Sequence, residues 1–173
     1  MVVLLLEAGA TPTAKDSKGQ TAPQLLMSNE ISYSGVSEEQ LREVLMALIT
    51  KCPDLVKVRD AEGRTPLHFA FEFGKAWAVT MLVVADSDLR ALDNLGRVPQ
   101  QVLDSKLKST GPGKKKAPTE WEKCETAYRE AVEAINTTRD LRSPSRFVGA
   151  PTVMDIFAAV EREKRAKEDP KRP

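Results

Sequence analysis

The stretch that decides the fold runs from Asp60 to Gly74 and reads Asp-Ala-Glu-Gly-Arg-Thr-Pro-Leu-His-Phe-Ala-Phe-Glu-Phe-Gly. Within it, Thr65 is a preferred N-cap residue, and Pro66 stands at the first helical position, where a missing N–H costs nothing. Gly63 suits a tight turn just before them, because a residue without a Cβ accepts positive φ. The stretch therefore predicts a turn followed by a helix that begins at Pro66.

The residues after Pro66 predict one short helix and then a second. Apolar side chains recur at spacings of three and four at Leu67, Ala70 and Phe71, and Gly74 suits the left-handed residue that ends a helix. A second helix is expected from about Ala76 to Ala85, with an apolar side formed by Val79, Leu82 and Val83. A unit of two short helices and two turns is too small to bury its own core, so it must stack on neighbours.

The same pattern restarts thirty-three residues after Asp60, with Asp93-Asn-Leu-Gly-Arg-Val-Pro99. A Thr-Pro-Leu-His-x-Ala segment at this period resembles the ankyrin repeat family. The resemblance implies an all-α fold, an ankyrin-repeat α-solenoid of paired short helices, here with additional C-terminal helices. It also implies that the imidazole of His68 hydrogen-bonds backbone between neighbouring repeats. The residues that carry the motif are Gly63, Thr65, Pro66, Leu67, His68, Ala70 and Gly74.

The resemblance covers residues 2–104 and divides residues 1–105 into about three repeats and a partial one. Residues 1–15 resemble the second helix and exit turn of a repeat whose first half is absent. Repeats then follow at 16–59, 60–92 and 93–105. In the first of these, Ala22-Pro23 stands where Pro-Leu is expected, and there is no histidine.

The repeats at Asp16 and Asp93 both depart from the pattern. The Asp16 repeat is longer than the standard unit, and we expect the excess near residues 29–37, before a second helix from Glu38 to Cys52. The Asp93 repeat is degenerate, with Gln100-Gln101 in place of Leu-His. Polar residues there suit a capping unit with one side facing water, and simple decay is the alternative.

The sequence changes character after Ser105. Residues 106–118 form a basic linker rich in helix breakers. Residues 119–137 predict a helix that caps the last repeat or docks on a partner, with a stripe of Trp121, Cys124, Tyr128, Ala131, Val132 and Ile135. A polar linker at 138–151 leads to an amphipathic helix at 152–169, which is a solvated helix end or a docking element for a partner groove. Its apolar side is formed by Val153, Ile156, Phe157 and Val160.

Composition predicts a soluble cytoplasmic protein, with the nucleus as the alternative location. The 26 basic and 25 acidic residues nearly cancel, so no overall field steers the chain toward nucleic acid or an anionic membrane. Cys52 and Cys124 lack metal-like spacing and are expected to be reduced thiols, with a disulfide between them as the alternative. No run approaches the roughly 20 apolar residues that span a bilayer.

We expect no enzyme activity, because few residue types suited to catalysis occur in a catalytic pattern. The single histidine, His68, already has the structural role that the resemblance implies. Neither Cys52 nor Cys124 has the glycine-rich or basic neighbours that mark a nucleophile. One histidine and scattered carboxylates do not make a metal cluster, so we predict no catalytic residue, cofactor or metal.

The expected function is a protein–protein interaction scaffold or adaptor that binds a partner through the concave face of the array. Small-molecule substrates and membranes are not expected. One alternative is a regulatory fragment of a larger multidomain protein or enzyme, and another is a nucleic-acid-associated protein that uses the basic linker. Arg64, Phe73 and Arg97 are the expected anchors, since Arg and aromatic residues dominate interface energetics. The full set of candidate contacts is Lys18, Gln20, Glu62, Arg64, Glu72, Phe73, Leu95 and Arg97.

Overall fold

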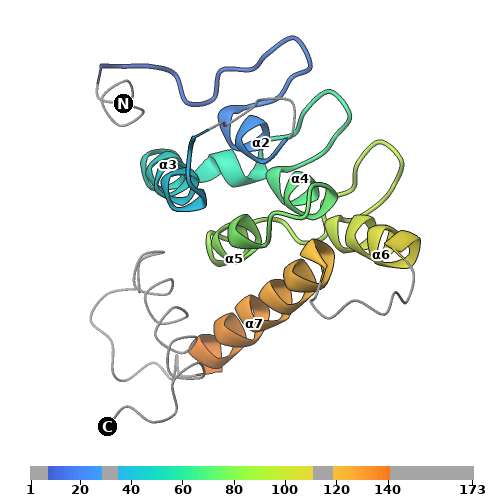
Figure 1. Ribbon diagram of the computed structural model, residues 1–173. Coiled ribbons are helices and arrows are strands. Elements are labelled where there is room, and N and C mark those ends of the chain that lie inside the picture. The colour runs from blue at the N-terminus through green and yellow to red at the C-terminus, as the bar shows by residue number, and fades with distance from the viewer. Residues whose placement is uncertain (1–7, 29–34, 111–118, 141–173) are drawn as a thin grey trace, which may run out of the picture.

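The computed structural model describes residues 8–28, 35–110 and 119–140, and every structural statement below refers to them. These residues form helices joined by turns, and none of them lies in a β-strand. The all-α prediction is confirmed. The helices, labelled as in Figure 1, are α2 (Ala22–Met27), α3 (Glu38–Lys51), the 3₁₀ helix η1 (Pro53–Lys57), α4 (Pro66–Glu72), α5 (Ala76–Val84), α6 (Pro99–Thr110) and α7 (Glu120–Asp140).

The helices lie in two rows. In one row α4 packs between α2 and α6, and in the other α5 packs between α3 and α7 (Figure 1). The turns that precede α2, α4 and α6 project on the same side of the molecule (Figure 1). Each helix of the first row is therefore paired with one of the second, as the repeat pattern predicts for α2–α3 and α4–α5.

The central pair, α4 and α5, follows the sequence prediction closely. Thr65 is the N-cap of α4, Pro66 is its first residue, and Gly74 follows it with a φ of +66°. The second helix ends at Val84, one residue before the predicted end. The boundaries of α4 therefore lie where the local capping residues predict them.

Helix α3 also begins and ends as predicted, within one residue. Ser37 caps it, because its hydroxyl accepts a hydrogen bond from the Gln40 backbone N–H. The Gln40 side-chain oxygen in turn accepts a hydrogen bond from the Ser37 backbone N–H. This reciprocal pair is a capping box, which satisfies two of the unpaired N–H groups at a helix start.

The last two helices correct the predicted boundaries. Helix α6 continues to Thr110, so residues 106–110, which we expected in the basic linker, are helical. The reason is packing: Leu107 extends the apolar side of Leu103 and lies partly buried against the core. Helix α7 runs to residue 140 rather than 137, and Thr119 begins it, since its hydroxyl accepts the Glu122 N–H.

Helix α7 takes the place that a second helix would have beside α6. It lies along α5 and also contacts α6, with Cys124 and Ala131 fully buried. The Tyr128 ring meets the Phe71 ring edge to face, with centroids 5.6 Å apart. We expected this helix to cap the Asp93 unit or to dock on a partner, and the structure packs it mainly along α5. The Asp93 unit thereby gains a second helix that the sequence did not assign to it.

Four parts of the prediction lie outside the described residues. They are the partial N-terminal repeat over residues 1–7, most of the insertion (29–34), the linker from 111 to 118, and everything from 141 onward, including the helix expected at 152–169. The basic cluster Lys114–Lys116, on which the nucleic-acid alternative depends, is among them.

Candidate functional site

Three turns of the same design precede α2, α4 and α6. In each, an aspartate carboxylate accepts the backbone N–H groups two and four residues later. For Asp60 these are Glu62 and Arg64, at 2.9 and 2.8 Å. Asp16 and Asp93 make the equivalent bonds in their own turns. Because each carboxylate is turned inward onto its own backbone, the two residues after it project outward.

The three turns are also bonded to one another. The Ala61 N–H donates to the Lys18 carbonyl at 3.1 Å, and the Asn94 N–H donates to the Glu62 carbonyl at 2.9 Å. The Asn94 side-chain amide adds a bond to the Ala61 carbonyl at 3.0 Å. Backbone bonds between successive turns fix their spacing, so the tips form one continuous surface.

We call this surface the turn ridge and define it by the residues that project from the three tips. All of them are exposed, and Leu95 has 76% of its surface accessible. An apolar side chain this exposed, between polar neighbours on a rigid turn, can bury substantial area in a complex. The turn ridge consists of Ser17, Lys18, Ala61, Glu62, Asn94 and Leu95.

Beneath the ridge, His68 joins two repeats in the way that the resemblance implied. The Thr65 N–H donates to Nδ1 at 3.0 Å, so the proton of the neutral ring is on Nε2. Nε2 lies 3.1 Å from the carbonyl oxygen of Arg97, in the next turn, and donates to it. Burial lowers the pKa of His68 because the charged form would be desolvated, although the Arg97 carbonyl opposes this shift.

Glutamines occupy the position of His68 in the other two repeats, and one of them also joins its repeat to the next, which the sequence analysis missed. Gln24 occupies the position of His68 in the first repeat. Its carbonyl oxygen accepts the Thr21 N–H at 2.7 Å, and its amide donates to the Arg64 carbonyl at 2.8 Å. Gln101 likewise accepts the Val98 N–H at 3.0 Å. An amide offers one acceptor and one donor at nearly the separation of the two imidazole nitrogens, and this equivalence was the available signal.

Arg64, expected to be an anchor for a partner, is committed within the molecule instead. Its guanidinium pairs with Asp60 at 2.9 Å and Glu72 at 3.2 Å, and its side chain is only 16% exposed. The guanidinium carbon also lies 4.4 Å from the centroid of the Phe69 ring. The Arg64 side chain therefore connects a turn to the helix that follows it.

Some of the remaining predicted contact residues are exposed enough to touch a partner, and others are buried. Gln20 is a correction, because it is only 2% exposed, although it has the same place in its turn as Arg64. Phe73 is partly buried, with its ring centroid 6.0 Å from that of Phe69. Arg97 pairs with Asp93 at 2.8 Å but keeps 41% of its side chain exposed. The structure places three predicted contacts, Lys18, Glu62 and Leu95, together on the ridge, and Glu72 beside Arg64 with its side chain 31% exposed.

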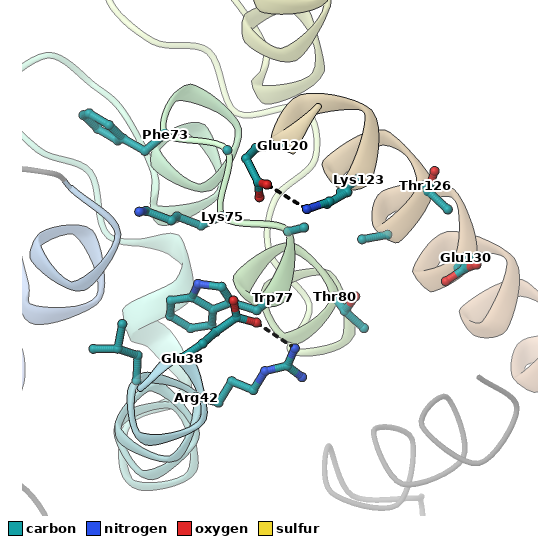
Figure 2. A pocket seen from close by; sticks show the side chains of 14 residues that line it. Glu38, Arg42, Phe73, Lys75, Trp77, Thr80, Glu120, Lys123, Thr126 and Glu130 are labelled. Carbon is teal, nitrogen blue, oxygen red and sulfur yellow. Dashed lines mark hydrogen bonds and ion pairs between the residues drawn. The ribbon is translucent and has the colours of Figure 1, made fainter. Parts of the chain in front are cut away.

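A second concave feature, absent from the sequence analysis, lies over the other row of helices. A groove of about 820 Å³ runs between α3 and α7 with α5 beneath it, and Figure 2 shows the side chains that line it. We call it the outer groove. Ion pairs border it on both sides: Glu38 with Arg42 from α3 at 3.1 Å, and Glu120 with Lys123 from α7 at 2.7 Å.

The described residues include His68 and both cysteines. Both ring nitrogens of His68 are within hydrogen-bonding distance of backbone groups, and burial raises the pKa of Cys124 to about 12, so its thiol is protonated at neutral pH. Cys52 and Cys124 are free thiols, as predicted. Within the described ranges there is no group of three or more His, Cys, Asp or Glu residues that could hold a metal ion. None of the helices described here is long and apolar enough to cross a bilayer.

Comparison with known proteins supports the repeat assignment. The chain is 38% identical over 100 residues to the mouse B-cell lymphoma 3 protein homolog, which carries ankyrin repeats. This similarity favours the ankyrin-repeat family. The match includes 57% of this chain and 21% of the mouse protein, so this chain covers about a fifth of that relative's length. No family model matches the chain.

Proposed function

We propose that this chain is a non-enzymatic protein-binding module, an ankyrin array that presents the turn ridge to a protein partner. The observation that carries the proposal is the set of hydrogen bonds between successive turns, from Ala61 to Lys18 and from Asn94 to Glu62. A surface held in one conformation before binding loses less conformational entropy in the complex, which favours affinity. We expect the stacked repeats to form a short solenoid in the cytoplasm.

The chemistry of the turn ridge suits a partner with mixed character. Lys18 offers a positive charge, and Leu95 offers an apolar side chain at the end of the row. Glu62 carries a negative charge that lies 3.4 Å from the Arg64 guanidinium, with 70% of its side chain exposed. Lys18 and Leu95 at the two ends of the row impose a direction on the bound partner, because a reversed partner would place its acidic residue against Leu95 and its apolar residue against Lys18. An extended or loop segment of a protein carrying an acidic, a basic and an apolar residue in that order would be complementary.

The proposal is tested by exchanging the ridge chemistry without altering the fold. The ridge variant combines Lys18→Glu, Glu62→Lys and Leu95→Ser, all at exposed positions. The expected result is loss of captured partner proteins by at least about tenfold in quantitative affinity capture, in line with removal of central contacts.

A matched control carries the same three types of change on the surface of α3 and just before it. It combines Lys51→Glu, Glu43→Lys and Val36→Ser, again at exposed positions. Both variants should keep the thermal midpoint of the unmodified chain, and only the control should retain the partners. Equal capture by both variants would contradict a role for the turn ridge in binding.

A further inference from the structure

The outer groove has the surface of a helix-binding site. Its floor is formed by Trp77 and Thr80 of α5, which are 8% and 3% exposed. Leu41 of α3 and Ala127 of α7 contribute apolar surface on the two sides. Four charged lining residues form two ion pairs, Glu38 with Arg42 and Glu120 with Lys123, as Figure 2 shows. Lys75 and Glu130 also line the groove. An apolar floor between charged edges is the arrangement that an amphipathic helix recognises.

The Thr80 hydroxyl gives an independent sign that this floor is not a finished surface. Its oxygen is buried and has no hydrogen-bond partner among the described residues. Buried hydroxyls are normally paired, because desolvation without a partner is unfavourable. Thr80 is among the residues that line the groove, so its unpaired hydroxyl lies next to this surface.

We propose that residues 152–160 of the same chain occupy the outer groove as a short helix. Val153, Ile156, Phe157 and Val160 have the spacing i, i+3, i+4, i+7, which places them on one side of a helix. Asp155 is the only charged residue in this segment, and the stripe does not include it. The segment therefore matches the apolar floor of the groove.

The chain length permits this return. Helix α7 has 21 residues and ends at Asp140, so it is about 30 Å long. Residues 141–151 can extend over at most about 36 Å. A helix running back along α7 would reach the part of the groove beside Glu130 first and then the part beside Glu120.

Tethering also favours this segment over a second copy of the chain. A short linker gives an attached segment an effective concentration in the millimolar range, well above micromolar protein. The inference does not depend on the function of the turn ridge, which lies on the other row of helices. A docked segment would close the α3–α5–α7 side and leave the turn ridge as the open surface.

Photo-crosslinking in the full chain tests the proposal. Thr126→benzoylphenylalanine places the probe on an exposed residue that lines the groove, and Arg129→benzoylphenylalanine is a matched control on the same helix, outside the lining. A mixture of unlabelled and ¹⁵N-labelled chains distinguishes crosslinks within a chain from those between chains. We expect the Thr126 probe to crosslink within its own chain to residues 152–160, and the control probe not to do so.

Other outcomes overturn the proposal. Mixed-isotope crosslinks would identify a second copy as the occupant, and no crosslink to residues 152–160 would show that the segment lies elsewhere. In the Thr126 probe background, Ile156→Asp with Phe157→Asp should reduce the crosslink yield at least tenfold, whereas Ala158→Asp, on the other side of the helix, should leave it unchanged. An undiminished yield in the double variant would contradict helix docking through the apolar stripe.

Discussion

Replacing His68 tests the hydrogen bonds that join the second and third repeats. In His68→Ala, the Thr65 N–H loses its acceptor and the Arg97 carbonyl loses its donor. Thr65 is only 1% exposed and His68 is fully buried, so water replaces these bonds incompletely. Each unpaired buried group costs about 1–3 kcal/mol, so the two groups together give a loss of about 2–6 kcal/mol in the free energy of unfolding.

The molecule supplies its own control, because glutamine occupies the same position in the neighbouring repeats. In His68→Gln, the side-chain oxygen can accept the Thr65 N–H, and the amide can donate to the Arg97 carbonyl, as Gln24 does with Thr21 and Arg64. We therefore expect His68→Gln to cost less than about 1.5 kcal/mol, as substitutions that conserve volume and polarity usually do.

Urea unfolding followed by tryptophan fluorescence measures both variants in one assay. Trp77 and Trp121 lie on α5 and α7, close to the repeats that His68 joins. The reasoning would be refuted if the alanine variant were as stable as the unmodified chain. It would also be refuted if the glutamine variant were destabilised as much as the alanine variant.

Three further predictions concern pH, a close contact and a buried ion pair. Burial lowers the pKa of His68 below 6.5, so the unfolded chain takes up the proton before the folded chain does as the pH falls. The contribution of His68 to the free energy of unfolding should therefore be steady above about pH 6.5 and fall below it. His68→Gln should remove this pH dependence in urea titrations. Gly63→Ala should destabilise the chain more than Gly96→Ala in thermal unfolding, although both glycines have positive φ. A Cβ at Gly63 would lie 2.6 Å from a side-chain atom of Asn94, whereas nothing lies within 4 Å of a Cβ at Gly96. Arg64→Ala should lower the free energy of unfolding by about 1–2 kcal/mol more than Arg97→Ala in denaturant unfolding. The reason is burial, because the Arg64 side chain is 16% exposed and that of Arg97 is 41% exposed. Equal losses would show that burial does not strengthen the ion pair between arginine and aspartate.

The sequence predicts those parts of the fold that depend on nearby residues. Thr65 and Pro66 start α4, Gly74 follows its end, and Ser37 starts α3 through contacts within four residues, so the pattern places these boundaries within one residue. The role of His68 was also predicted, because the motif that contains it resembles a known repeat. These features need no knowledge of which distant segments meet.

Features that depend on distant contacts could not be read in the same way. Gln20 and Arg64 have the same place in their turns, yet Gln20 is buried and Arg64 is held by Glu72 and Phe69. A register rule assigns both residues to the surface, because it describes the turn and not what packs against it. Helix α7 is a similar case, since its position beside α5 depends on the contact between Cys124 and the α4–α5 pair.

The residues proposed to contact the partner differ between the sequence analysis and the structure. Sequence reasoning chose arginine and aromatic anchors, and the structure shows that Arg64 and Phe73 already contribute to internal packing. The exposed surface is instead formed by Lys18, Glu62 and Leu95, which were also predicted contacts. Composition at an interface is therefore a weaker guide than the hydrogen bonds and packing that determine which side chains are available.

Hydrogen exchange on the complex with a captured partner tests the central claim most directly. Binding should slow exchange at the turn ridge, over residues 17–18, 61–62 and 94–95, and leave exchange in α3, α5 and α7 unchanged. Slower exchange confined to the outer groove, with the three turns unchanged, would contradict the claim that this chain binds its partner through the turn ridge.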